Sequence, residues 1–235
     1  MNFIKLSIIA TSLLLIGCGS DSKSDNNSPK ATNISDATSN MKALGAIDNL
    51  SNIKTNSSIS KIQKLSKTQN FPCSGGGTIS MEATEDEKTM SITMDKCTEP
   101  DSFIDGSMIL IEQDNGYYKM EMSDLTVKDS NGDKTSAKHF VMEGNDNEYW
   151  SKIDGDISFV SKCFTGTFNI KTLEKMYEMQ DGSDGLEKGK IELNGATYDF
   201  NYPNVTIKAG SETKTMLQSE LDKEMEESTT CKISQ

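Results

Sequence analysis

Thr78-Ile79-Ser80-Met81-Glu82-Ala83 and Thr89-Met90-Ser91-Ile92-Thr93-Met94 alternate strictly between polar and apolar residues. Successive side chains of a strand point to opposite faces of a sheet, so this period of two predicts two strands with one buried face each. The alternation returns downstream, at 118–122, 125–127, 190–193 and 198–202. These segments decide the fold class, which we predict to be mainly β.

Asn-Gly dipeptides separate the alternating segments, at Asn115-Gly116, Asn131-Gly132 and Asn194-Gly195. These residues tolerate the positive φ angles of tight hairpin turns. We therefore predict an antiparallel, hairpin-rich sheet, either an open curved sheet or a partial barrel. A weak repeat also occurs, since Phe103-Ile104-Asp105-Gly106 resembles Lys152-Ile153-Asp154-Gly155, and it indicates a repeated strand-turn unit.

Helical spacing of apolar residues flanks this β-rich part on both sides. On the N-terminal side the spaced residues are Met41, Leu44, Ile47, Leu50, Ile59, Ile62 and Leu65. They predict one or two amphipathic helices that pack on the domain, because the polar face carries few lysines. On the C-terminal side the residues are Met216, Leu217, Leu221 and Met225, which predict a short helix.

The segment from Gly19 to about Asn40 consists mostly of Ser, Asp, Asn, Lys and Thr, with Pro29 and few apolar residues. Such a composition cannot offset the entropy cost of ordering the chain. We therefore predict a flexible tether over 18–40 and a single β-rich domain over 41–235, which includes the N-terminal helical segment.

The first residues combine a positive charge at Lys5 with an apolar stretch, 6–16, that is too short to span a bilayer. The stretch ends in Leu15-Ile16-Gly17-Cys18, which resembles the lipobox of bacterial lipoproteins. An ordinary signal peptide with an incidental cysteine is the alternative, but no A-x-A-like cleavage site lies nearby.

The lipobox resemblance implies that residues 1–17 are a cleaved signal peptide and that Cys18 carries a thioether-linked diacylglycerol, joined in many bacteria by an N-acyl group such as palmitate. Two or more acyl chains give stable anchoring to a membrane. In this family an aspartate after the cysteine retains the protein at the inner membrane, and Gly19 stands there instead. The resemblance therefore implies the cell envelope, at the outer membrane.

Four further cysteines, Cys73, Cys97, Cys163 and Cys231, are an even number in a chain predicted to be exported, where oxidation is favoured. Three pairings are possible. We favour Cys73 with Cys97, because this pair brackets two strand-like segments, and Cys163 with Cys231. A zinc site is the alternative, but no C-x-x-C spacing occurs and His139 is the only histidine.

The segment Cys73-Ser74-Gly75-Gly76-Gly77 is similar to the start of the sheet in secreted, β-rich bacterial lipoproteins of unassigned function, and this resemblance implies no activity. We expect these glycines to form a bulge or a strand entry beside the disulfide. The formal net charge is −12 and every basic residue is lysine. Without arginine or a basic patch, nucleic acid is excluded as an expected partner.

The sequence offers no catalytic site: it lacks G-x-S-x-G and the complete S-x-x-K motif set, and His139 has no triad signature. His139 is predicted to be a surface histidine of a strand. Acidic turns at 129–133 and 181–187 admit a calcium hypothesis, but turn chemistry explains them and the first fails the EF-hand spacing.

Methionines suggest a copper alternative, in which Met90, Met94, Met120, Met122 and Met142 join His139 as soft ligands. Packing in the interior explains the same methionines, because their alternation places them on one face of the strands. We expect no metal and no cofactor beyond the covalent lipid on Cys18.

The sequence therefore favours a membrane-anchored, non-enzymatic binding or structural module, whose partner is an envelope protein, a glycan or a lipid. The alternative is a carrier that encloses an apolar ligand or lipid between the sheet and the N-terminal helices. An enzyme that uses dispersed carboxylates is the third and weakest hypothesis.

Overall fold

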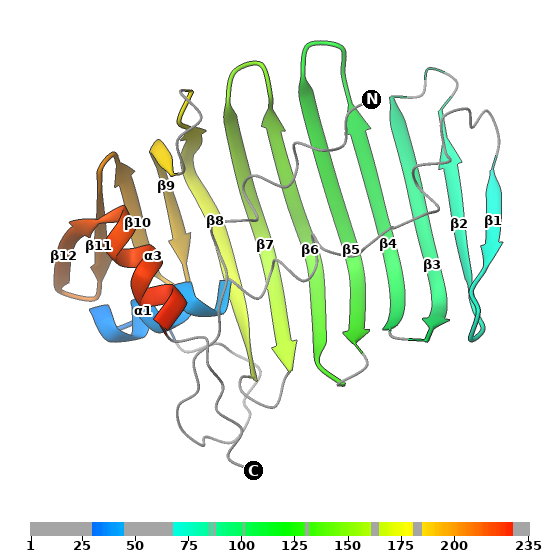
Figure 1. The fold of residues 1–235 in the computed structure, drawn as a ribbon, viewed down its shortest axis with the longest axis horizontal. Helices are drawn as coiled ribbons and strands as arrows, with labels where there is room; N and C mark the ends of the chain where they lie inside the picture. The colour runs from blue at the N-terminus through cyan, green and yellow to red at the C-terminus, as the bar shows by residue number, and fades with distance from the viewer. Residues whose placement is uncertain are drawn as a thin grey trace. The chain divides into compact units, whose positions relative to one another are not determined.

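The structure, a computed structural model, describes residues 30–44, 68–84, 86, 88–100, 102–129, 132–160, 165–180 and 185–227. The predictions for the signal peptide, Cys18, the helical segment 47–65, Cys163 and Cys231 lie outside these residues. Within them the fold class is confirmed: the strands pair antiparallel and follow one another in chain order in the sheet (Figure 1).

The described elements are twelve strands and two helices. The strands are β1 (Gln69–Pro72), β2 (Thr78–Ala83), β3 (Thr89–Glu99), β4 (Ser102–Glu112), β5 (Tyr117–Asp129), β6 (Lys134–Asn145), β7 (Trp150–Val160), β8 (Thr165–Glu178), β9 (Leu186–Leu193), β10 (Ala196–Asn201), β11 (Asn204–Ala209) and β12 (Glu212–Leu217). The helices are α1 (Ile34–Leu44) and α3 (Gln218–Glu227).

The chain divides into two compact units, where the sequence predicted a single domain over 41–235. Ile53–Ser158 contains β1 to β6 and most of β7, and we call it the strand unit. The other unit combines Met1–Asn52 with Phe159–Gln235; it contains β8 to β12, α1 and α3, and we call it the helix-covered unit. Each unit is described separately below.

Asn-Gly turns connect neighbouring strands as predicted. Asn115 and Gly116 lie between β4 and β5, and Asn194 and Gly195 join β9 to β10 with φ angles of 48° and 80°. Gly132 lies in the turn between β5 and β6 and has a φ of 85°, whereas its neighbour Asn131 lies outside the described residues. The hairpins of the sheet therefore use the turn chemistry that the sequence indicates.

The repeated Ile-Asp-Gly sequence was predicted to be a strand-turn unit, and this prediction is wrong. Both copies lie inside strands, at Gly106 of β4 and Gly155 of β7, with φ angles of 125° and 138°. A Cβ on Gly106 would lie 2.6 Å from the Cα of Leu125 in β5. The glycines are there because neighbouring backbones approach closely at irregular points of the sheet, where bulges bend strands.

In the helix-covered unit, α1 begins at Ile34, so the prediction that the tether extends to residue 40 is wrong. Asn33 caps the helix, since its Oδ1 accepts a hydrogen bond from the Asp36 amide at 2.8 Å. Asp36 in turn accepts hydrogen bonds from the amide and hydroxyl of Thr32, and these lower the pKa of its carboxyl. The polar residues that suggested a tether thus form the cap of a helix.

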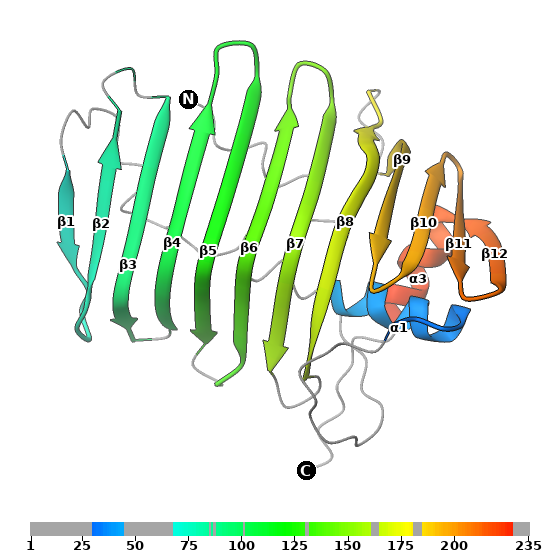
Figure 2. The ribbon, with the colours of Figure 1, turned by 180° about the vertical axis from the view of Figure 1, so that it is seen from behind.

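One face of α1 packs on the sheet of the same unit (Figure 2). Ala37 and Met41 are buried, and the hydroxyl of Tyr198 in β10 donates a hydrogen bond of 2.6 Å to the Ala37 carbonyl. Burial raises the pKa of Tyr198 far above its ordinary value. The buried hydroxyl has its partner, so the helix and the strand are fixed together.

The predicted C-terminal helix is present as α3, but Met216 and Leu217 belong to β12 instead. Leu221 is buried, as expected for the inner face of the helix. The side chain of Gln218 bonds to the backbone of Leu186 through both amide atoms, at 3.1 and 2.8 Å. These bonds fasten the start of α3 to β9.

Candidate functional site

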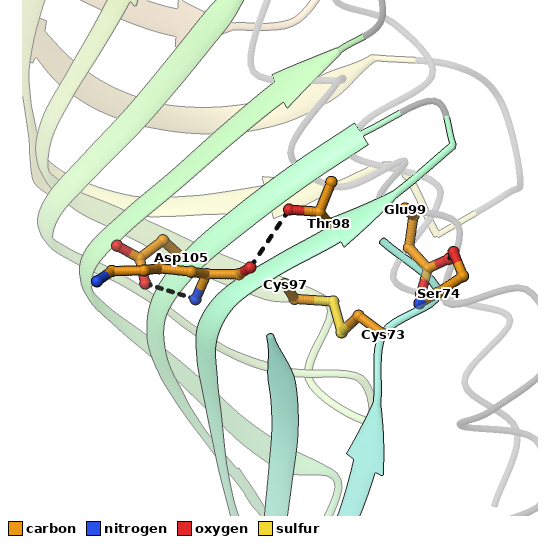
Figure 3. Close-up of a disulfide and its surroundings, with 7 residues drawn as sticks. Cys73, Ser74, Cys97, Thr98, Glu99 and Asp105 are labelled. Atoms are coloured by element: carbon orange, nitrogen blue, oxygen red, sulfur yellow. Dashed lines mark hydrogen bonds between the residues drawn. A yellow bond between two sulfur atoms is a disulfide. The ribbon is translucent and has the colours of Figure 1, made fainter. Parts of the chain in front are cut away.

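The predicted disulfide between Cys73 and Cys97 is present, with a Cα–Cα distance of 5.5 Å (Figure 3). The glycine-rich loop beside it pairs with the end of β3, because Gly75 donates to the Thr98 carbonyl and Thr98 donates to the Gly76 carbonyl. This loop is the strand entry that we expected. The disulfide ties the first hairpin of the strand unit to β3.

Cys73, Cys97 and Glu99 form the one close group of potential metal ligands among the described residues. The two sulfur atoms are joined to each other, and a disulfide sulfur is not the thiolate that zinc requires. Glu99 also accepts hydrogen bonds from the amide and hydroxyl of Ser74. In the disulfide-bonded state these residues stabilise the hairpin and offer no thiolate to a metal.

Next to the disulfide, β3 carries an irregularity between Met94 and Cys97. Lys96 has a φ of 47°, and its amide donates a hydrogen bond of 3.0 Å to Oδ1 of Asp105 in β4 (Figure 3). The Thr98 hydroxyl donates to the Lys96 carbonyl at 3.4 Å. Asp105, the acidic residue of the first Ile-Asp-Gly copy, therefore stabilises a bulge.

Methionines gather on one face of the strand unit, which we call the methionine face. The register places them directly opposite one another or opposite other apolar residues: Met120 faces Met142, and Met108 faces Met122. The methionines of this face are Met81, Met90, Met94, Met108, Met120, Met122 and Met142. Alternating strand positions predicted five of them as interior packing residues, and the register adds Met81 and Met108.

Exposure divides the methionine face into two parts. Met81, Met94 and Met122 are buried, with 3 to 6% of their surface exposed. The half-buried members are Met90, Met108, Met120 and Met142, together with Ile104 and Leu110 on the same strands. Residues 68 to 158 are described as strands and turns only, so the described part of this unit supplies no helix to cover the face.

His139 does not belong to the buried part of this face. It is exposed, with a φ of 51°, whereas its neighbour Phe140 is 1% exposed. The prediction of a surface histidine is confirmed. The copper hypothesis requires an imidazole beside thioethers, and the geometry of His139 gives no support to it.

The opposite face of the same strands carries charged and polar residues. Glu143 of β6 accepts hydrogen bonds from Lys152 at 2.8 Å and from the Tyr117 hydroxyl at 3.2 Å. The bond from Lys152 is the main cause that lowers the pKa of Glu143 below 4.5. Lys119 and Glu121 of β5 form a further ion pair on this face. This face, which we call the charged face, also carries apolar residues such as Ile109 and Val141, which the register places opposite Glu121.

The first acidic turn behaves as a turn. The carboxylate of Asp129 accepts a hydrogen bond of 2.9 Å from the Asp133 amide, and the Asp129 amide donates to the Asp133 carbonyl at 3.0 Å. Turn chemistry accounts for these contacts without calcium. Most of the second acidic stretch, 181–184, lies outside the described residues.

A shallow cavity of about 420 Å³ lies on the outer face of β8 to β10 in the helix-covered unit, and the sequence interpretation did not anticipate it. Lys188 lies over the ring of Tyr177 at 4.7 Å, and Lys190 pairs with Asp199 at 2.9 Å. Lys188 and Lys190 lie at alternate positions of β9, and this pattern in the sequence indicates a charged face. Lys190 and Asp199 compensate each other's charge, as on an ordinary polar sheet surface.

No protein-family model matches the chain, and no curated protein matches it significantly. Among the helices of the described residues, none has both the length and the apolar character needed to cross a bilayer. The proposed function therefore rests on the sequence and on the geometry within each unit.

Proposed function

We propose that this chain is a lipid-anchored protein of the cell envelope, a non-enzymatic module that binds a partner through the methionine face. The half-buried methionines of this face are the observation that carries the proposal. The lipobox at Cys18 and the expected outer-membrane location come from the sequence and are part of the proposal.

Methionine suits a binding face because its unbranched thioether side chain adapts to different partner shapes. Met120 and Met142 face each other on neighbouring strands, and both keep part of their surface exposed. In this proposal the half-buried apolar side chains on neighbouring strands form the site of interaction. The charged face, with Glu143 and Lys152 paired, faces water in this proposal.

The second candidate is a carrier, in which the partner is a single apolar molecule such as a lipid. Leu110, opposite Met120, continues the apolar row toward β3, where it faces Met90. A row of long, flexible side chains favours an extended acyl chain over a flat polar ligand. The two candidates share the same face and differ in what occupies it.

Extraction of the full-length lipoprotein in mild detergent, followed by native mass spectrometry, separates the candidates. A co-purifying lipid supports the carrier, and a lipid-free protein that is cross-linked to an envelope partner supports the binding module. Met120→Glu should lower binding of the lipid or partner several-fold, because it introduces a charge on the methionine face. Ser123→Glu, on the exposed opposite face of β5, is the matched control.

Equal binding by the wild type, Met120→Glu and Ser123→Glu would contradict the use of the methionine face. Anchoring is tested separately with labelled fatty acid. The Cys18→Ala variant should carry no label, since the thioether forms only on that sulfur, and a labelled variant would overturn the lipoprotein proposal.

A further inference from the structure

The described chain begins at one end of the helix-covered unit. The Ala31 amide donates a hydrogen bond of 2.8 Å to the Asn194 carbonyl, in the turn between β9 and β10. A Cβ on Gly195 would lie 2.8 Å from Cγ of Lys30, so the Lys30 side chain crosses this turn. The point where the N-terminal segment reaches the folded unit is therefore fixed.

The same segment continues across a second turn at this end of the strands. A Cβ on Gly210, between β11 and β12, would lie 2.3 Å from the Thr32 carbonyl oxygen. The Ile34 amide then donates to the carboxylate of Glu212 at 2.9 Å. The two turns and the segment over them form a surface that we call the proximal rim: Lys30, Thr32, Gly195, Gly210 and Ser211.

We infer that the proximal rim faces the lipid bilayer and that the turn at Tyr202 and Pro203 faces away from it. The inference rests on the proposed lipidation of Cys18. Residues 19–29 separate Cys18 from Lys30, and a chain of this length spans about 20 Å on average and about 40 Å when fully extended. The rim is thus held within this distance of the headgroups.

The opposite end of the unit is further from the anchor by the length of a strand. β10 runs from Ala196, beside the rim, to Asn201, and six residues of strand extend over about 17 Å. Tyr202 follows directly and is 50% exposed, and Leu217, paired with the nearby Asn204, is 42% exposed. The two exposed apolar side chains therefore lie at the end of the unit opposite the point where the N-terminal segment reaches it.

The rim carries neutral and charged side chains. Thr32 and Ser211 are exposed and neutral, and the Lys30 side chain adds a positive charge in a protein whose formal net charge is −12. The acidic side chains nearby, Asp36 and Glu212, accept hydrogen bonds from backbone amides of the segment. Hydrogen bonds do not neutralise these carboxylates, so Lys30 offsets only part of their negative charge.

Energy transfer to the membrane tests the orientation. The full-length lipoprotein is reconstituted into phosphatidylethanolamine–phosphatidylglycerol vesicles that contain an acceptor-labelled lipid. A donor fluorophore is attached through a genetically encoded azide at position 211 in one sample and at position 202 in the other. Transfer from position 211 should exceed transfer from position 202 by about twofold or more, because the second site is about one strand length further away.

A variant with the tether doubled by Ser-Gly residues inserted before Lys30 should lower transfer at both positions and keep their order. Equal transfer at the two positions, or greater transfer from position 202, would overturn the orientation while leaving lipidation intact. Absence of transfer from both positions together with absence of fatty-acid label would instead overturn the proposed function, so the two failures are distinguishable.

Discussion

Ile207 in β11 and Ile104 in β4 hold comparable places, each inside a strand with an apolar inner face. Ile207 is completely buried, and α1 contacts the strand that carries it. Ile104 is half-buried, in a unit whose described residues form strands and turns only. Leu125 and Phe140 of the strand unit are nevertheless about as buried as Ile207, so alternation creates an apolar face in both units, and the exposed fraction of its side chains varies along the strands.

The largest difference between the units should appear when these two isoleucines are shortened. Ile207→Ala should lower the free energy of unfolding by about 4 kcal/mol, because it leaves a cavity in a closed interior. Ile104→Ala should cost about 1 kcal/mol, since only part of its surface is removed from water. Urea unfolding of the protein without its lipid measures both values.

An equal loss of unfolding free energy for Ile104→Ala and Ile207→Ala would contradict the proposed difference between the two positions. It would mean that the methionine face is a closed core in solution, and the proposed use of that face for binding would then fail. A small loss for Ile104→Ala together with a large one for Ile207→Ala would support it.

The strand unit has the Cys73–Cys97 disulfide as its own means of stabilisation. The double substitution Cys73→Ser and Cys97→Ser should lower the free energy of unfolding by about 3 kcal/mol, because the bond closes a loop with a sequence separation of 24. Chemical denaturation followed by the tryptophan signal of Trp150, within the same unit, measures it. Reduction of the wild type should lower the free energy of unfolding by a similar amount. If neither the double substitution nor reduction lowers it, the hairpin is stable without the disulfide.

A glycine at an irregular point of β4 gives a further test of the strand unit. Gly106→Ala should cost about 2 kcal/mol, because the residue has a φ of 125° and the added Cβ would lie 2.6 Å from the Leu125 Cα. Gly132→Ala is the matched control: its φ of 85° is also positive, but no atom lies within 4 Å of its Cβ position. The control should cost about 1 kcal/mol. Equal decreases in melting temperature for Gly106→Ala and Gly132→Ala would show that neighbouring residues move to relieve the close contact at Gly106.

Local chemistry made much of the fold predictable. Strict alternation identified β2 and β3, Asn-Gly identified the turn between β9 and β10, and the spacing of Cys73 and Cys97 around two strands identified their bond. In each case the signal lies within a short stretch of sequence and depends on backbone geometry alone.

The features that were missed depend on contacts between distant residues. The segment around Asn33 looked like a tether because its polar residues can either remain in water or cap a helix, and its contacts with Glu212 and Asn194 decide the outcome. The Ile-Asp-Gly copies looked like turns because glycine permits a turn as readily as a bulge. Alternation placed five of the methionines together as packing residues, but the exposed fraction of each side chain depends on which other residues cover it.

The smallest expected effect concerns the charged face of the strand unit. Lys152 and Tyr117 hold the pKa of Glu143 below its ordinary value of 4.5, so the charged form is favoured in the folded protein. This contribution to stability is fully present above about pH 4.5 and is lost as the pH falls through the folded pKa. Because the pair is partly exposed, we expect a contribution of only about 0.5 kcal/mol.

Glu143→Gln should therefore make the free energy of unfolding less dependent on pH between 6 and 3 than in the wild type, with urea titrations at each pH as the measurement. Glu112→Gln, at the exposed end of β4, is the control for removing a carboxylate elsewhere on the unit. An unchanged slope for Glu143→Gln would mean that Lys152 and Tyr117 do not stabilise the folded state through this carboxylate. A slope reduced by more than the expected amount would mean that the pairing of Glu143 with Lys152 contributes more to the stability of the strand unit than its partial exposure suggests.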